Sequence, residues 1–322
     1  MSMKTIGVLT SGGDSPGMNA AVRAVVRTAI EHGMTVKGIM RGYTGLIEND
    51  IIDLNLRSVS DIIHRGGTVL YTARCPEFKT EEGMQTAIAN CRKNGIEGIV
   101  VIGGDGSYRG ARDLSERGIP CVGIPGTIDN DISSTDYTIG FDTAVNTAME
   151  MVDKLRDTAQ SHDRCTVVEV MGRRAGYLAL HTGIAVGATV ILVPEVPFDF
   201  QKDVVDKIKK TQTMGKKHFI IVVAEGVGNV AGIAERISHE CNIEARATVL
   251  GHVQRGGSPT VRDRVMASEM GNKAVELLCQ GIGNRVMCFR QDKVFDKDIF
   301  EALNEKKPYE FELHEIANTI SI

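Results

Sequence analysis

Apolar residues gather in short continuous runs along the chain, and each run ends in a turn rich in glycine or polar residues. The runs do not alternate with polar residues, which is typical of strands buried on both faces of a sheet. Segments with helical spacing follow several runs, as Met18–Arg27 follows the first. The pattern therefore predicts strands at 6–9, 98–102, 121–124, 166–171, 190–193 and 219–223.

Strands that alternate with helices predict parallel sheets in an α/β sandwich. In such sheets ligands bind beyond the carboxyl ends of the strands. The turns at 12–13, 103–107 and 125–131 follow strands of the first half, and Met171–Arg173 and Ala224–Gly226 follow strands of the second. The sequence therefore predicts two similar α/β lobes that face a shared cleft.

Composition narrows the class of protein. At roughly 150 residues a domain, 322 residues suggest about two domains. A net charge of -4 gives no reason to expect nucleic acid or a membrane as the main partner. No stretch approaches the roughly 20 apolar residues of a membrane span, and Gly12-Gly13-Asp14 would interrupt a signal-peptide core. The seven scattered cysteines fit thiols in a reducing compartment, so we expect a cytoplasmic protein.

The turns Gly12–Gly13 and Gly103–Gly106 predict phosphate binding. Without a Cβ, backbone amides approach phosphate oxygens closely, and a following helix adds a favourable dipole. Neither turn has the Walker A or the dinucleotide-binding pattern. Asp105 would face phosphate only through a bridging metal, and Mg²⁺ is typically held by one or two carboxylates plus phosphate oxygens. The alternative is that Asp105 merely caps a helix that starts near Ser107.

The segment Pro125–Asp131 carries two carboxylates, Asp129 and Asp131, separated by one residue. In a tight turn both can reach one site, and a carboxylate can accept the proton of a hydroxyl that attacks phosphate. Asp129, which follows Thr127, is the better placed. The alternative is a local turn of the kind that Asp-Asn-Asp favours, and spacing alone leaves both open.

Arginines are expected at several loop ends, where a planar guanidinium group can bind phosphate. They are Arg74, Arg164, Arg173, Arg246 and Arg255. For any one of them, a solvated surface ion pair is the simpler explanation. His252 and Arg255 lie between an apolar run and a glycine turn, and we interpret them together as an anion clamp.

Six segments in order carry a resemblance to a known family: 9–14, 71–75, 103–107, 125–131, 171–173 and 251–257. From about residue 3 to the ending at 316–322, the chain resembles bacterial ATP-dependent 6-phosphofructokinase. The resemblance implies two Rossmann-like three-layer α/β/α lobes with largely parallel sheets and a cleft between them. The ATP-binding lobe would comprise 1–140 plus about 254–304, and the sugar-phosphate lobe about 141–253 plus 305–322.

The resemblance also implies phosphorylation of the 1-hydroxyl of fructose 6-phosphate by ATP with Mg²⁺. Residues in contact with ATP would be Gly13, Tyr43 near the adenine, Arg74, Cys75, Gly104, Asp105 on the metal, Gly106 and Ser107. Catalytic residues would be the base Asp129 with Thr127, Arg173, Asp131, Arg74 and Gly13. The sugar-phosphate pocket would comprise Thr127, Ile128, Asp129, Arg164, Met171, Gly172, Arg173, Glu225, Arg246, His252, Val253, Gln254 and Arg255. In the family, typically a tetramer, the equivalents of Arg164 and Arg246 reach in from a neighbouring subunit.

Two glycines bear on the identity of the phosphoryl donor. Relatives that use pyrophosphate carry an aspartate at the position of Gly106 and a lysine at that of Gly126. A carboxylate at the first position would crowd and repel the α-phosphate of ATP. Both positions are glycine here, so ATP is the expected donor.

A second anion site, for activating ADP or inhibitory phosphoenolpyruvate, is implied as well. Its members would be Arg23, Arg27, Asp61, Arg156, Gly187, Thr189, Lys216, Lys217 and His218. From the residues alone, 216–218 would be a solvated basic turn. The family commonly has an acidic metal ligand at the place of Thr189 and an arginine where Met214 aligns. We therefore expect an anion pocket with a blunted or altered response to both effectors.

Other functions fit the sequence less well. An NAD or lipid kinase shares the Gly-Gly-Asp-Gly loop but lacks the segment 125–131 and the pair of His252 and Arg255. A sugar-phosphate sensor without catalysis would require the loss of a base, metal ligand or phosphate-binding arginine, and the chain has all of these. A dinucleotide oxidoreductase would require a fingerprint that the chain lacks.

Overall fold

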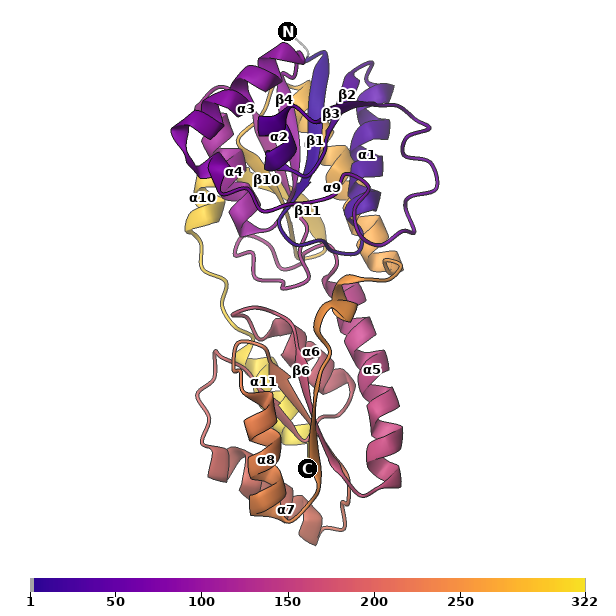
Figure 1. Ribbon diagram of the computed structural model, residues 1–322, viewed down its shortest axis with the longest axis vertical. Coiled ribbons are helices and arrows are strands. Elements are labelled where there is room, and N and C mark those ends of the chain that lie inside the picture. The colour runs from indigo at the N-terminus through magenta and orange to yellow at the C-terminus, as the bar shows by residue number, and fades with distance from the viewer. Residues whose placement is uncertain (1–2, 322) are drawn as a thin grey trace. The chain divides into compact units, whose positions relative to one another are not determined.

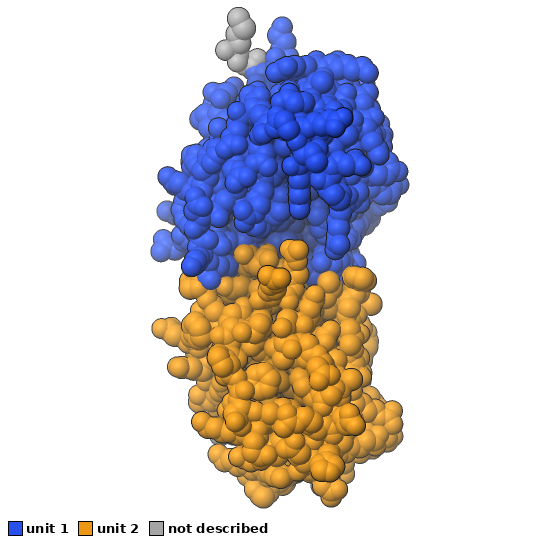
Figure 2. All heavy atoms as spheres, turned by 60° about the vertical axis from the view of Figure 1, so that its left-hand side comes forward, with its two compact units in different colours: residues 1–128, 132–143, 255–307 blue, residues 129–131, 144–254, 308–322 orange. Residues whose placement is uncertain are grey.

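The computed structural model describes residues 3–321, and their contacts divide the chain into two compact units (Figures 1 and 2). Unit 1 comprises the chain up to residue 128 with 132–143 and 255–307. Unit 2 comprises 129–131, 144–254 and the chain from 308 onward. Residue 322, which ends the C-terminal segment named above, lies outside the described residues.

Unit 1 is built on a seven-stranded sheet of order β11-β10-β5-β4-β1-β2-β3. Its strands are β1 (Thr5–Ser11), β2 (Thr35–Ile39), β3 (Ile51–Leu54), β4 (Gly98–Gly103), β5 (Cys121–Pro125), β10 (Arg285–Arg290) and β11 (Lys293–Asp298). The five inner strands are parallel, and only the edge strands β3 and β11 are antiparallel. Every residue of β4 is buried, as its continuous apolar run predicts.

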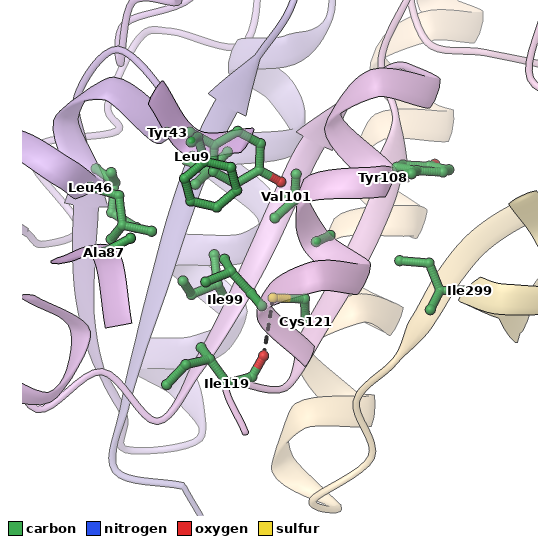
Figure 3. Close-up of a cluster of buried hydrophobic side chains, with 14 of the residues drawn as sticks. Leu9, Tyr43, Leu46, Ala87, Ile99, Val101, Tyr108, Ile119, Cys121 and Ile299 are labelled. Carbon is green, nitrogen blue, oxygen red and sulfur yellow. Dashed lines mark hydrogen bonds between the residues drawn. The ribbon is translucent and has the colours of Figure 1, made fainter. Parts of the chain in front are cut away.

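Helices cover both faces of this sheet (Figure 1). They are α1 (Met18–Glu31), α2 (Tyr43–Glu48), α3 (Glu81–Lys93), α4 (Asp105–Glu116), α9 (Val261–Cys279) and α10 (Ile299–Asn304), with the 3₁₀ turn η1 (Glu77–Lys79). Helices α1 and α9 pack together on one face. On the other face α3, α4 and α10 enclose a core that includes Leu9, Ile99 and Tyr108 (Figure 3).

Unit 2 has a four-stranded, fully parallel sheet of order β7-β8-β6-β9. The strands are β6 (Cys165–Val170), β7 (Val190–Leu192), β8 (Phe219–Ala224) and β9 (Ala245–Val249). The helices are α5 (Phe141–Ser161), α6 (Tyr177–Ala185), α7 (Asp206–Thr213), α8 (Val230–Cys241) and α11 (Phe311–Ile320), with the π-helical η2 (Phe200–Val205) and the 3₁₀ helix η3 (Gly251–Arg255). The predicted α/β class with largely parallel sheets is confirmed, as are all six predicted strands.

Within residues 3–321 the seven cysteines are free thiols, and only Cys75 and Cys279 are more than marginally exposed. Burial raises the pKa of Cys91 and of Cys165, each to about 12. In the same range, no helix combines the length and the apolar character that crossing a bilayer would require.

Candidate active site

Two glycine loops follow the carboxyl ends of two neighbouring strands of unit 1. Strands β1 and β4 are paired up to their last residues, Ser11 and Gly103. The hydroxyl of Ser107 donates to the carbonyl of Ser11 at 3.1 Å, which joins the second loop to the first. A Cβ on Gly103 would clash with both of these groups, so the close approach requires glycine. Both loops therefore lie at the carboxyl edge of one sheet, as predicted.

The first turn of α4 has room for an anion. Gly104 is the N-cap residue and has no side chain to accept from the first helical amides. Nothing lies within 4 Å of a Cβ built on Gly106. Amides at a helix N-terminus, with the helix dipole, attract phosphate groups, so the local geometry fits the predicted phosphate site.

Asp105 is the first residue of α4, so the alternative that it caps a helix starting near Ser107 is wrong. The cap position belongs to Gly104, because the helix starts two residues earlier than expected. The Asp105 carboxylate, about half exposed, forms an ion pair with Arg109 one turn later, at 3.0 Å. Its position in the first helical turn leaves it able to face a ligand at the helix N-terminus.

The loop that carries Arg74 and Cys75 is attached to the end of β1. Thr72 Oγ1 donates to the carbonyl of Gly12 at 2.7 Å, and Thr10 Oγ1 donates to that of Tyr71 at 2.8 Å. Arg74 is exposed two residues beyond Thr72. These bonds bring the predicted arginine to the edge where the glycine loops lie.

Tyr43 supports α4 from inside the core of unit 1. Its ring is stacked on Phe78, with centroids 4.1 Å apart, and its hydroxyl donates to the carbonyl of Ser107 at 2.6 Å. The side chain is buried, and burial raises its pKa well above the usual value. A direct contact with adenine stays a prediction from the resemblance, whereas the structure gives Tyr43 a role beneath the first turn of α4.

The segment with the two carboxylates leaves β5 next to β4. Gly126 N donates to the carbonyl of Gly103 at 3.0 Å, and a Cβ on Gly104 would lie 3.9 Å from that of Thr127. Asn130 has a positive φ of 50°, so the chain does turn here. Asp129 is only 4% exposed, whereas the carboxylate of an ordinary surface turn is solvated. The segment therefore forms the local turn that Asp-Asn-Asp favours, and its buried Asp129 also fits the role of a base.

In unit 2 several expected sugar-phosphate residues lie at the carboxyl ends of the neighbouring strands β6 and β8. Glu225 N donates to the carbonyl of Val170 at 2.9 Å. The side chain of Gln254 is buried and accepts from Met171 N at 3.3 Å. Arg173 follows with a positive φ of 57° and an exposed side chain. Burial and the nearby Glu225 raise the pKa of Glu169, the residue before Val170 in β6.

Arg164 and Arg246 lie at the opposite, amino end of the unit 2 sheet. Arg164 precedes β6, and Arg246 is inside β9 rather than at a loop end, which corrects the sequence interpretation. Both guanidinium groups bind the carboxylate of Glu244, at 2.7 and 2.8 Å, and thereby lower its pKa. A six-residue strand spans roughly 20 Å, so these arginines do not converge with Met171 and Arg173 within one chain.

The expected clamp of His252 and Arg255 has a different local geometry. The guanidinium of Arg255 donates to the carbonyl of Asp14 at 2.9 Å and lies directly against Gly13. His252 is exposed in η3. Arg255 thus contacts the first glycine loop of unit 1, while Gln254 before it contacts Met171, the residue after β6 of unit 2.

The residues implied for an effector site form two groups. In unit 1, Arg23 and Arg27 lie one turn apart on α1, and burial together with Arg27 lowers the pKa of Arg23. In unit 2 the ammonium of Lys216 donates to the hydroxyl of Thr189 at 3.0 Å. Burial and the charge of Arg156, which is bonded to the carbonyl of Val186, lower the pKa of Lys216.

One buried carboxylate, Asp263, escaped the sequence analysis. It lies three residues after Thr260, a spacing that indicates a capping box at the start of a helix. Thr260 does cap α9 by accepting from Asp263 N at 3.3 Å. The carboxylate, however, accepts from Tyr137, Gly140 and Thr143 instead of from the cap residue.

Parallel sheets with glycine loops at their carboxyl edges define a phosphate-binding α/β protein. The family model described as phosphofructokinase matches residues 5–278. The chain belongs to the phosphofructokinase family. Curated relatives named ATP-dependent 6-phosphofructokinase, from Bacillus velezensis and Bacillus subtilis, are each 58% identical over 320 residues, which is 99% of this chain and all of theirs.

Solved structures agree with this assignment. Phosphofructokinase from Saccharomyces cerevisiae superposes with a TM-score of 0.89 at 35% identity. The match covers 99% of this chain and 48% of that one, so this chain spans about half of the yeast chain. A pyrophosphate-dependent phosphofructokinase from Marinobacter aquaeolei, 23% identical with a TM-score of 0.86, shares the fold over 96% of this chain and 86% of its own.

Proposed function

We propose that this chain is an ATP-dependent 6-phosphofructokinase. It transfers the γ-phosphoryl group of ATP to the 1-hydroxyl of D-fructose 6-phosphate and releases fructose 1,6-bisphosphate and ADP, the committed step of glycolysis in the cytoplasm. The observation that carries the proposal is the edge of unit 1, where Gly12–Gly13, Gly103–Gly106 and Thr127 leave three neighbouring strands. The names of the 58% identical relatives support the same reaction.

Unit 1 would bind the nucleotide. The amides of the first turn of α4 would hold its phosphates, and Arg74 would add charge from the loop tied to Gly12. Gly13, Tyr43, Cys75 and Ser107 complete the proposed ATP site. Because α4 is already formed from Asp105 onward, with Gly104 as its N-cap, the backbone of the proposed phosphate site would need little rearrangement.

Asp105 fits the role of a magnesium ligand that acts together with the nucleotide. It is half exposed in the first turn of α4, next to the open space at Gly106. Among the described residues no three acidic, histidine or cysteine side chains form a metal-binding group. One carboxylate plus phosphate oxygens and waters is the usual arrangement for Mg²⁺, which would neutralise phosphate charge. The ion pair with Arg109 would have to open.

On the acceptor side, Asp129 would take the proton of the sugar 1-hydroxyl. General-base assistance of this kind contributes about 10²–10⁴-fold. Thr127 and Arg173 would lie around the transferring phosphoryl group, with Asp131 supporting the metal side. The remaining proposed sugar-phosphate residues are Met171, Gly172, Glu225, His252, Val253 and Gln254 in unit 2 and Ile128 and Arg255 in unit 1.

ATP is the proposed donor rather than pyrophosphate. The space at Gly106 is open, which suits the α-phosphate of ATP. A Cβ on Gly126 would lie 3.1 Å from Ile102 and 3.2 Å from Met18, so a lysine there, as in the pyrophosphate enzymes, would require both of these side chains to shift. A coupled assay of fructose 6-phosphate with ATP, repeated with pyrophosphate, tests this directly. Activity with pyrophosphate and not with ATP would overturn it.

We further propose a homotetramer in which Arg164 and Arg246 serve the sugar-phosphate site of a neighbouring subunit. Their position beside Glu244, at the amino end of the unit 2 sheet, supports this. The residues around Lys216, Lys217 and His218, with Asp61 and Gly187, would form an effector site together with Arg23, Arg27 and Arg156. Because Lys216 contacts a neutral hydroxyl of Thr189, we expect weak activation by MgADP.

A further inference from the structure

Asp263, in the first turn of α9, is fully buried and anchors a distant segment of unit 1. Its carboxylate accepts hydrogen bonds from Tyr137 Oη at 2.5 Å, Gly140 N at 2.7 Å, Thr143 N at 2.9 Å and Thr143 Oγ1 at 2.5 Å. Burial raises the pKa of this carboxyl group, and the hydrogen bonds oppose that rise. These four hydrogen bonds hold the donors in place around the carboxylate, because the loss of any one of them leaves a buried polar atom unsatisfied.

The residues bonded to Asp263 make further contacts with two other parts of unit 1. The Thr143 hydroxyl also accepts from Thr260 N at 3.0 Å, which ties it to the cap of α9. Gly140 has a φ of 105°, and a Cβ there would lie 2.6 Å from that of Ser15, so this turn rests against the loop that follows Gly12–Gly13. The segment 137–143 is therefore held against both α9 and the first glycine loop.

The same segment holds the start of the carboxylate turn. Ile139 accepts from Thr127 N at 3.1 Å and donates to the carbonyl of Pro125 at 2.8 Å. The hydroxyl of Thr138 donates to the carbonyl of Thr127 at 2.7 Å. Ile128 and Ile132, on either side of residues 129–131, are both buried. The path from Asp263 to the proposed base thus consists of short, buried contacts.

We infer that Asp263 is a positioning residue for phosphoryl transfer, which fixes Thr127 and Asp129 through the segment 137–143 without touching substrate. The inference rests on the proposed function. Displacement of a reacting group by about 1 Å can cost about 10²-fold in rate. The amides proposed to hold the nucleotide lie in the first turn of α4, outside the segment 137–143, so the loss should fall mainly on kcat rather than on KM.

The test compares single substitutions in steady-state assays with fructose 6-phosphate and MgATP. Asp263→Asn and Thr143→Val should each lower kcat by about 10²-fold, with little change in either KM. Thr143→Ser keeps the hydroxyl and should restore most of kcat, and Tyr137→Phe, which removes one donor, should have a smaller effect. If Asp263→Asn does not fold, the comparison of Thr143→Val with Thr143→Ser tests the inference, since only the serine variant keeps the hydroxyl.

Leu278→Ala is the matched control, because Leu278 is fully buried near the other end of the same helix. It should lower the melting temperature at least as much and leave kcat unchanged. Hydrogen exchange of the peptide 126–143, measured without substrate, should rise in Asp263→Asn and not in the control. Faster exchange with normal kcat overturns the inference. A wild-type protein without phosphofructokinase activity would instead refute the proposed function, and the exchange result would still show whether Asp263 holds the segment.

Discussion

The carboxyl edge of the unit 1 sheet and the corresponding edge of unit 2 differ in how completely one chain builds them. In unit 1, two glycine loops and the segment after β5 are joined by the hydrogen bonds of Ser107 and Gly126. In unit 2, Met171 and Glu225 lie at the carboxyl edge, but Arg164 and Arg246 lie at the other end of the sheet. The donor half of the proposed site is therefore local, whereas the acceptor half, in the proposed tetramer, would draw on Arg164 and Arg246 of a neighbouring subunit.

The largest effect is expected at Asp129, the proposed base, which would act on the sugar hydroxyl as it attacks the nucleotide phosphate. Asp129→Ser should lower kcat by about 10²–10⁴-fold, because it removes the proposed base for the hydroxyl proton, with little change in KM. A coupled assay measures it, with Asp136→Ser, an exposed ion-pair partner of Arg290, as the control. Near-normal turnover of Asp129→Ser would contradict the assigned role and with it the proposed reaction.

A second substitution tests whether the donor half is specific for ATP. Gly106→Asp should fold normally, since nothing lies near the new Cβ. Repulsion between its carboxylate and the α-phosphate should raise the KM for ATP by roughly 10–10³-fold. Gly106→Ala is the uncharged control, and equal effects of the two variants would show that crowding rather than charge is responsible.

The acceptor half can be tested by mixing subunits. Arg164→Ala should raise the KM for fructose 6-phosphate by roughly 10–10²-fold, the value of one or two lost charged hydrogen bonds. Refolded together with Asp129→Ser, it should regain part of the activity, because some sites then combine an intact base with an intact arginine. Arg236→Ala, which breaks an ion pair with Glu240 on α8, is the control. No recovery on mixing would mean that each chain builds its own acceptor site.

The smallest effect is expected at the effector residues of unit 2. Thr189→Glu places a carboxylate next to the ammonium of Lys216, which is 3.0 Å from the present hydroxyl. It should increase activation by MgADP severalfold, because the metal regains an anionic ligand. Thr189→Gln, which has a side chain of nearly the same size without the charge, is the control. Strong MgADP activation of the unchanged protein would refute the expectation of a blunted response.

The strands that the sequence predicts are those buried on both faces, such as β4 and β8, where every position is apolar or glycine. The strands that it missed lie at the edges of the two sheets or next to an edge strand. In β9 and β11 most positions are partly or fully exposed and several are charged. Their pairing depends on a neighbouring strand far away in sequence, which no local pattern records.

The site could be predicted in part for a similar reason. A glycine loop after a buried strand is a local signal, and both loops lie where expected. Asp263 gives the local signal of a helix cap, while its carboxylate bonds to residues more than a hundred positions away. Arg255 likewise reaches Asp14 through the fold rather than through spacing. Local chemistry is readable from sequence, and long-range partners are not.

The distribution of thiols has a practical consequence. Five of the seven cysteines are buried, and burial raises the pKa of Cys91 and Cys165 to about 12, which keeps them protonated and slow to react. Alkylation by a maleimide should therefore be confined to Cys75 and Cys279. Because Cys75 follows Arg74 in the loop bonded to Gly12, its labelling rate would report occupancy of the proposed nucleotide site without sugar or turnover.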